Sequence, residues 1–456
     1  KKEKALPLQP AQSLPVEISA FNPQKDEYIL LAWSKKGMHF ISDSDRYFSL
    51  AAPGNTIMAQ LIKRGETPEM VTENVILTYR IESGFKTPSR QVAFWQFAPA
   101  LMGRKIPADT GISGNKTSGK LTFDDALGAY IAREIPLIPY PDNTGFHPYP
   151  LVTLEAKDPA SGEILATIQF TAPVSTEMGC RNCHGGPWRK ADRAGISDPT
   201  ASDILTVHDR INRTNLGQMA QAGQPQRCQA CHAGADAKSG QQDLKALNLS
   251  AAMHGFHANF MPTSDDRTCG LCHPSGANTF TRGLRGIHAE LEFECANCHG
   301  SMTAHALSLL LAEKAAGKKG ADRFITHLEP DSDPPLSEIS PRKPWVNLPD
   351  CLNCHVDFTP PETDTSFNQW TETESDLYRL RTDDAGIMCA ACHGAPHALY
   401  PATNIFGNNR DNIPPIQYQK NPYPLGADEG CRVCHTVDMQ EEIHHPNSLA
   451  LFRNTR

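Results

Sequence analysis

All 14 cysteines of this 456-residue chain fall within seven copies of one short motif, Cys-x-x-Cys-His. Two cysteines at this spacing lie on one turn of the chain and can form thioether bonds to the two vinyl groups of a porphyrin. The histidine that follows then lies beneath the iron as its fifth ligand. The motif therefore predicts seven covalently attached c-type haems.

We expect both cysteines of every motif to carry haem, namely Cys180, Cys183, Cys228, Cys231, Cys269, Cys272, Cys295, Cys298, Cys351, Cys354, Cys389, Cys392, Cys431 and Cys434. The proximal iron ligands would be the motif histidines His184, His232, His273, His299, His355, His393 and His435. Structural zinc is a poorer interpretation, because it takes four ligands and an odd number of cysteine pairs does not combine into four-cysteine sites. A thioredoxin-like dithiol would occur once, near a βαβ pattern.

The sixth ligand of each iron separates an electron carrier from a catalyst, since a catalyst needs an open position. The candidates for this distal ligand are His208, His254, His257, His288, His305, His397 and one of the pair His444 and His445. His305 and His397 follow a motif histidine too closely to reach around the same haem, so we expect each to serve a neighbouring one. His254 and His257 lie about one helical turn apart and are expected to serve two different haems.

The remaining composition limits the location and the partners. The formal net charge is −8, and no basic cluster occurs, which argues against nucleic acid as a partner. No run of 18 apolar residues occurs, so no transmembrane segment is expected. The chain opens KKEKALPLQP without an apolar signal segment. Because covalent haem attachment takes place outside the cytoplasmic membrane, we expect a secreted protein, periplasmic or extracellular, whose signal has been removed.

The fold class expected is an N-terminal β-sandwich-like domain followed by a haem-nucleated, mostly irregular and α-helical region. The β-rich domain would cover residues 1–175, with a four-haem region at 176–329, a Pro-rich linker at 330–349 and a three-haem region at 350–456. Apolar runs predict strands at 28–33 and 75–80, and a hairpin at 151–157 and 163–170. A helix is predicted at 303–317. Since the motifs begin only 26 to 56 residues apart, we expect porphyrin faces to replace a conventional apolar core.

From Gly179 onward the chain resembles the multihaem c-type cytochromes of metal-reducing and sulfur-metabolising bacteria. The segments that carry the resemblance are ILTVHDR, AMHGFHANF, LRGIHAELEFECANCHG and GIMCAACHGAPHALYP. The resemblance implies periplasmic or cell-surface electron transfer along a chain of haems. Some members form extracellular filaments in which a histidine of one protomer binds an iron of the next, and His39 and the pair His444 and His445 are placed near the chain ends for such an exchange.

Three functions are therefore open. The first is an electron-transfer protein, not an enzyme, with seven bis-His haems and with redox proteins or extracellular acceptors as partners. The second is a multihaem oxidoreductase with one catalytic haem acting on a small nitrogen or sulfur oxyanion; such enzymes often carry Cys-x-x-Cys-Lys, which is absent from this sequence. The third is the subunit of a homopolymeric conducting filament.

Overall fold

The strands of the N-terminal region form two antiparallel sheets around one apolar core. The computed structural model describes residues 16–143, 145–186, 198–234, 245–261, 266–275, 279–359, 361, 367–407, 409–427, 430–439 and 444–445. The first sheet has the order β1 (Tyr28–Ser34), β4 (Ile57–Lys63), β9 (Ala129–Ala132), β8 (Thr122–Asp124), with β5 (Glu69–Val71) paired to β4. The second has the order β11 (Ile164–Thr171), β10 (Leu151–Lys157), β6 (Ile76–Ile81), β7 (Ser118–Lys120).

The apolar patterns of the sequence explain these strands. β1 is buried along almost its whole length because β4 pairs beside it and other elements cover both of its faces. β6 alternates between buried and more exposed residues, as expected for a strand with one face on the core. β10 and β11 form the predicted hairpin around the turn at Asp158–Gly162, where Gly162 has a positive φ of 74°. All three strand predictions are confirmed.

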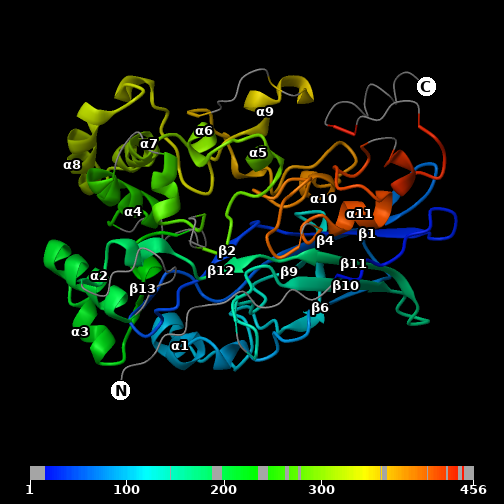
Figure 1. The fold of residues 1–456 in the computed structure, drawn as a ribbon, viewed down its shortest axis with the longest axis horizontal. Coiled ribbons are helices and arrows are strands. Elements are labelled where there is room, and N and C mark those ends of the chain that lie inside the picture. Colours follow the sequence, from blue (N-terminus) through cyan, green and yellow to red (C-terminus); the bar gives the residue numbers. More distant parts are fainter. Residues whose placement is uncertain are drawn as a thin grey trace.

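Two short parallel pairs attach the following segments to the sheets. β12 (Val174–Ser175) pairs with β2 (His39–Phe40), and β13 (Gln226–Arg227) pairs with β3 (Phe48–Ser49). A helix, α1 (Phe94–Met102), lies below the sheets in Figure 1. Thus β2 and β3 pair with the residues that lie directly before the first and second cysteine motifs.

The later region is mixed helical. Its helices are α2 (Asp198–Asn212), α3 (Leu216–Gln221), α4 (Leu249–His257), α5 (Ile287–Glu290), α6 (Cys295–His299), α7 (Met302–Ala315), α8 (Lys319–Leu328), α9 (Cys351–Cys354), α10 (Cys389–His393) and α11 (Ile413–Gln419). The predicted helix at 303–317 is confirmed as α7. Its first turn is capped by Ser301, whose hydroxyl accepts from the backbone N–H of Ala304, and Gly317 follows its end with φ of 77°.

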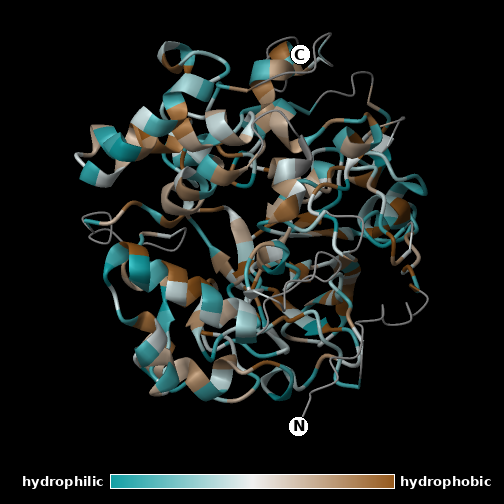
Figure 2. Cartoon of the chain, turned by 60° about the vertical axis from the view of Figure 1, so that its left-hand side comes forward, coloured by the Kyte–Doolittle hydropathy of each residue, from teal (hydrophilic) through white to brown (hydrophobic). Residues whose placement is uncertain are grey.

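The expectation that this region lacks a conventional apolar core is wrong around α7. Buried side chains of α4, α7 and α8 form a compact cluster that includes Leu307, Leu310 and Ile325. Gly255 permits the approach of α4 to α7, because a Cβ at that position would lie 3.1 Å from Leu310. Along the helices of the molecule, brown hydrophobic residues alternate with teal hydrophilic ones (Figure 2).

The C-terminal part packs onto the sheets. Met388, Tyr418 and Val433 belong to the same apolar core as the strands. The hydroxyl of Tyr418 donates to the carbonyl oxygen of Leu30 in β1 at 2.8 Å. α10 and α11 accordingly lie against the sheets at the right of Figure 1. The β-rich part and the last part of the chain therefore share one core.

The Pro-rich segment at 330–349 also packs against its surroundings. Ile339 is buried in the α4–α7–α8 cluster, and the backbone N–H of Arg342 donates to the carbonyl oxygen of Ser308 at 2.9 Å.

No helix within the described ranges is long and apolar enough to cross a bilayer.

Candidate cofactor sites

Each cysteine motif forms one tight helical turn. The motifs lie on the short helices η2 (Gly179–Asn182), η4 (Cys228–Ala230), η7 (Asp266–Leu271), α6, α9, α10 and η12 (Gly430–Val433). In motif 1, for example, the backbone N–H of His184 donates to the carbonyl oxygen of Cys180 at 2.9 Å. We number the motifs and their sites 1 to 7 in chain order. The described structure includes all fourteen cysteines, and none of them forms a disulfide.

Every motif histidine faces a second histidine of the same chain across a gap of nearly constant width. The distances between ring centroids are 6.4 Å for His184 and His257, 6.5 Å for His232 and His208, 6.1 Å for His273 and His254, 6.3 Å for His299 and His397, 6.1 Å for His355 and His288, 6.2 Å for His393 and His445, and 6.5 Å for His435 and His444. Rings this far apart cannot hydrogen-bond to each other. Two imidazoles that bind one metal atom from opposite sides, with metal–nitrogen bonds of about 2 Å, have centroids roughly 6.3 Å apart.

The orientation of these rings also suits metal binding. In half of the paired histidines, Nδ1 contacts an oxygen: Asp203 Oδ2 for His184, Thr214 Oγ1 for His208, Leu247 O for His232, Ser250 O for His254, Met253 O for His257, Glu66 O for His435 and Asp383 Oδ2 for His444. Where a carbonyl or carboxylate accepts, Nδ1 must donate, which leaves the lone pair on Nε2. Ligating histidines are commonly oriented by such a partner.

Burial keeps several of these imidazoles neutral. Burial, and to a lesser extent neighbouring histidines, lower the pKa of His254 and of His299 to about 3. Burial is also the main cause that lowers the pKa of His393 to about 4. A neutral imidazole is the form that binds a metal.

The histidines that face the motif histidines come from different elements. His208 lies on α2, His254 and His257 on α4, and His288 on α5, while His397, with φ of 63°, follows α10. As expected, His254 and His257 face two different motif histidines, and His397 faces His299 of motif 4 instead of its neighbour in sequence.

Two expectations about the distal residues do not match this geometry. The sequence predicts only one ligand from the pair His444 and His445, but each faces its own motif histidine. It also predicts His305 as a ligand. The centroid of His305 lies 5.9 Å from that of His299, but its Nδ1 and Nε2 lie 2.9 and 3.1 Å from Nη2 of Arg342. His397 faces His299, and no arginine of the described part of the chain contacts its ring nitrogens.

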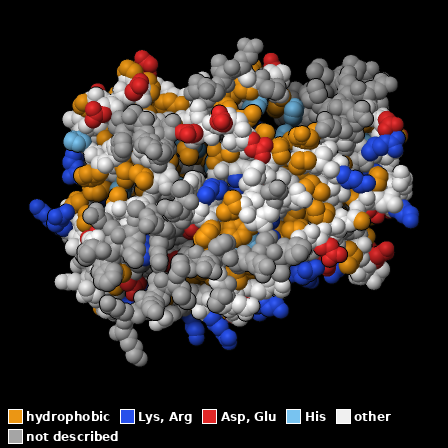
Figure 3. All heavy atoms as spheres, viewed as in Figure 1, with side chains coloured by type: hydrophobic (Ala, Val, Ile, Leu, Met, Phe, Trp, Pro, Cys, Tyr) orange, Lys and Arg blue, Asp and Glu red, His pale blue; other side chains and the backbone are white. Residues whose placement is uncertain are grey.

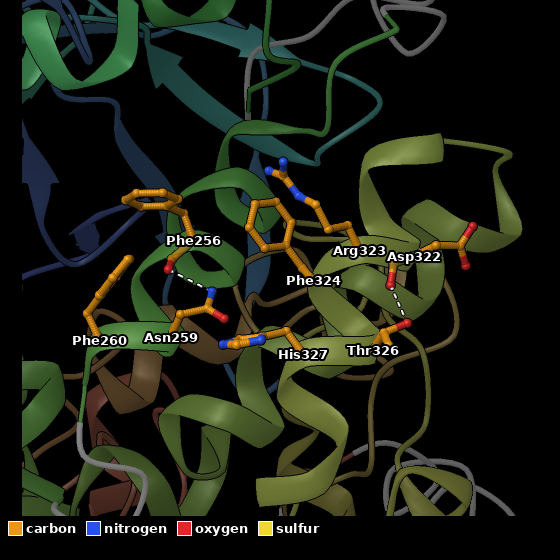
Figure 4. A pocket seen from close by; sticks show the side chains of 8 residues that line it. All are labelled: Phe256, Asn259, Phe260, Asp322, Arg323, Phe324, Thr326 and His327. Carbon is orange, nitrogen blue, oxygen red and sulfur yellow. Dashed lines mark hydrogen bonds between the residues drawn. The ribbon is translucent and has the colours of Figure 1, made fainter. Parts of the chain in front are cut away.

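Three further histidines stand outside the pairs. Nε2 of His39 lies 2.9 Å from the carbonyl oxygen of Ala52. His147 is buried and stacked on Phe406, with ring centroids 4.6 Å apart. His327 is exposed on α8, where it lines a pocket of about 740 Å³ together with Phe256, Phe260 and Phe324 (Figure 4).

The sites are neighbours in an order that differs from chain order. Cys180 of site 1 interacts with Cys272 of site 3 and with Cys228 of site 2; burial and then these neighbours raise its pKa to about 12. The backbone N–H of Gly179 donates to the carbonyl oxygen of Cys272 at 2.9 Å. Hence site 1 lies between sites 2 and 3.

The second half of the sites continues this order. Cys351 of site 5 interacts with Cys298 of site 4 and Cys389 of site 6, and Cys392 of site 6 interacts with Cys434 of site 7. Sites 3 and 4 meet at His305, whose ring contacts His254 as well as His299. The neighbours therefore run 2, 1, 3, 4, 5, 6, 7.

No family model, curated protein or solved structure matches this chain in the comparisons with known proteins. The arguments about function therefore depend on the motifs and the geometry of their sites.

Proposed function

We propose that this chain is an electron-transfer protein that holds seven covalent c-type haems, each between a motif histidine and a distal histidine. The observation that carries the proposal is the set of seven histidine pairs with ring centroids 6.1 to 6.5 Å apart. When bound, haem iron supplies a one-electron couple between its ferric and ferrous states. The fold would then be a strand-rich N-terminal part against a region organised by its haems.

The residues of the chain define how the sites act. Both cysteines of each motif would fix the porphyrin, and the two histidines would fill both axial positions, so that no iron keeps an open coordination position. We assign the distal positions to His208, His254, His257, His288, His397, His444 and His445. The neighbour relations of the cysteines give an unbroken path in the order 2, 1, 3, 4, 5, 6, 7.

This arrangement favours electron transfer over the catalytic alternative. A haem enzyme needs one iron with an exchangeable sixth position, but the motif histidine of every site already faces a histidine. A filament linked by exchanged histidines is also disfavoured, because His444 and His445 face motif histidines of their own chain. The covalent haem motif supports a location outside the cytoplasmic membrane, with redox proteins or extracellular acceptors as partners.

The surface agrees with redox proteins or extracellular acceptors as partners more than with nucleic acid. On the described part of the face in Figure 3, acidic and basic side chains are interspersed and no broad basic area appears. The net charge of the chain is −8, and haem propionates would make it more negative.

The mass of the intact protein and its spectrum test the proposal. We expect seven haems per chain, low-spin spectra in both redox states, and no binding of carbon monoxide by the reduced native protein. Fewer than seven haems, or stoichiometric carbon monoxide binding, would contradict it. Steady-state assays with nitrite, hydroxylamine and tetrathionate address the enzyme alternative, which requires turnover well above that of free haem.

A further inference from the structure

A buried arginine lies where sites 3 and 4 meet. The ring of His305, at the start of α7, has its centroid 4.4 Å from that of His254 and 5.9 Å from that of His299. His254 belongs to site 3 and His299 to site 4. Nη2 of Arg342 lies 2.9 Å from Nδ1 and 3.1 Å from Nε2 of His305. The guanidinium is therefore one side chain away from both sites.

The position of Arg342 is fixed by several contacts. The residue is 3% exposed. Its Nε donates to Oγ of Ser308 at 3.0 Å, its backbone N–H donates to the carbonyl oxygen of the same residue, and its guanidinium lies 4.9 Å from the ring centroid of Trp370. Burial lowers the pKa of Arg342 to about 10, so it remains charged at neutral pH.

Among the residues that the structure describes, no carboxylate balances the charge of Arg342. Two other buried arginines have acidic partners: Arg285 pairs with Asp411 at 2.8 Å, and Arg410 pairs with Glu82 at 2.6 Å. Within the described ranges, Arg342 forms no such ion pair. Its contacts are instead a neutral imidazole, a hydroxyl and an aromatic ring. A buried cation without a carboxylate partner is costly unless another negative charge compensates it, so its retention here points to a role in the field of the neighbouring sites, whose haems would carry propionates.

We infer that Arg342, positioned by His305, raises the reduction potentials of the haems at sites 3 and 4. The inference rests on the proposed function. Adding an electron makes an iron site more negative by one unit, and a nearby fixed cation stabilises that change most where water is excluded. With an effective dielectric constant of about 20 and a separation of about 10 Å, the interaction changes the one-electron equilibrium by about tenfold. Since sites 3 and 4 are in the middle of the path, electrons would be held preferentially at its centre.

Redox titration of the full haem-loaded protein tests the inference. In Arg342→Gln, two of the seven centres should be reduced about tenfold less readily, a shift of about 59 mV to lower potential, while the other five stay near their original potentials. Arg342→Lys keeps the charge and should retain most of the original potentials. Arg323→Gln is the matched control, because Arg323 is an exposed arginine on α8, and it should shift none.

The positioning role of His305 has its own test. His305→Asn should keep seven low-spin haems and show a smaller shift at the same two centres, because Arg342 loses its contact without losing its charge. If Arg342→Gln binds seven low-spin haems and their potentials are unchanged, the inference is wrong while the proposed function stands. If Arg342→Gln does not take up haem, unchanged potentials in His305→Asn would overturn it. Failure of the proposed function would appear separately, as missing haems or carbon monoxide binding in the unsubstituted protein.

Discussion

His444 and His445 are consecutive residues whose imidazole rings face different motif histidines. The centroid of His444 lies 6.5 Å from that of His435, and the centroid of His445 lies 6.2 Å from that of His393. Each ring has a further neighbour: Asp383 contacts Nδ1 of His444, and Phe358 stacks on His445 with centroids 4.4 Å apart. One dipeptide thus approaches both site 6 and site 7.

Replacing either histidine of this pair should open one site. We expect His444→Ala to make the haem of site 7 high-spin and His445→Ala to do the same at site 6, because each loses one axial ligand. Each reduced variant should bind one equivalent of carbon monoxide, and the double variant two, as measured by optical titration. A single variant that stays fully low-spin would show that its histidine is not a ligand.

At site 4, His397 and His305 should behave differently. His397→Ala is expected to give one high-spin haem in electron paramagnetic resonance spectra, because His299 then lacks its facing histidine. His305→Gln should leave all seven haems low-spin, because the ring nitrogens of His305 contact Arg342. The reverse result would assign the sixth ligand of site 4 to His305.

A buried ion pair joins the strands to the last part of the chain. Arg410 donates through Nη2 to Glu82 at 2.6 Å and through Nε to the carbonyl oxygen of Tyr149 at 2.7 Å. Arg410→Met leaves Glu82, whose side chain is 14% exposed, without its charged partner, and we expect the free energy of unfolding to fall by about 3 kcal/mol in urea denaturation.

The matched control for this ion pair is Arg80→Met. Arg80 is mostly exposed and lies 3.8 Å from Glu155, so its loss should cost less than about 1 kcal/mol. Equal losses in the two variants would mean that the buried pair does not join the two parts of the chain.

Asp45 should make the stability of the protein depend on pH. This carboxyl is completely buried, and its burial raises its pKa to about 8. In the unfolded chain an aspartate titrates near about 4. Between these values the folded protein keeps a proton that the unfolded chain has released, so the free energy of unfolding falls as pH rises, by about 1.4 kcal/mol per pH unit.

The variant Asp45→Asn isolates this effect, because an amide stays neutral at every pH. Its stability relative to the unsubstituted protein should increase from pH 5 to pH 8 and then level off, measured by urea denaturation at several pH values. Asp198→Asn, at an exposed position, is the control and should show no such trend. A difference between Asp45→Asn and the unsubstituted protein that does not vary with pH would contradict the prediction.

The sequence predicts the strands and helices that local patterns determine, and it misses the residue pairings that depend on contacts between distant parts of the chain. The apolar run of β1, the hairpin of β10 and β11, and the helix α7 follow from short-range periodicity. The pairing of His299 with His397 joins residues almost 100 positions apart, so no local signal distinguishes it from a pairing with His305. The packing of Tyr418 on β1 is equally non-local. It explains why the division at residue 175 does not separate two independent cores.

His254 and His257 occupy one turn of α4, a rigid element held by its own backbone hydrogen bonds. A rotation of the helix would move both rings together and leave their separation unchanged. If porphyrins occupy sites 1 and 3 as proposed, the distance that an electron must tunnel between them would be insensitive to fluctuations of the surrounding loops. Transfer through this part of the path would proceed at a steady rate even while the exterior of the protein adapts to a docking partner.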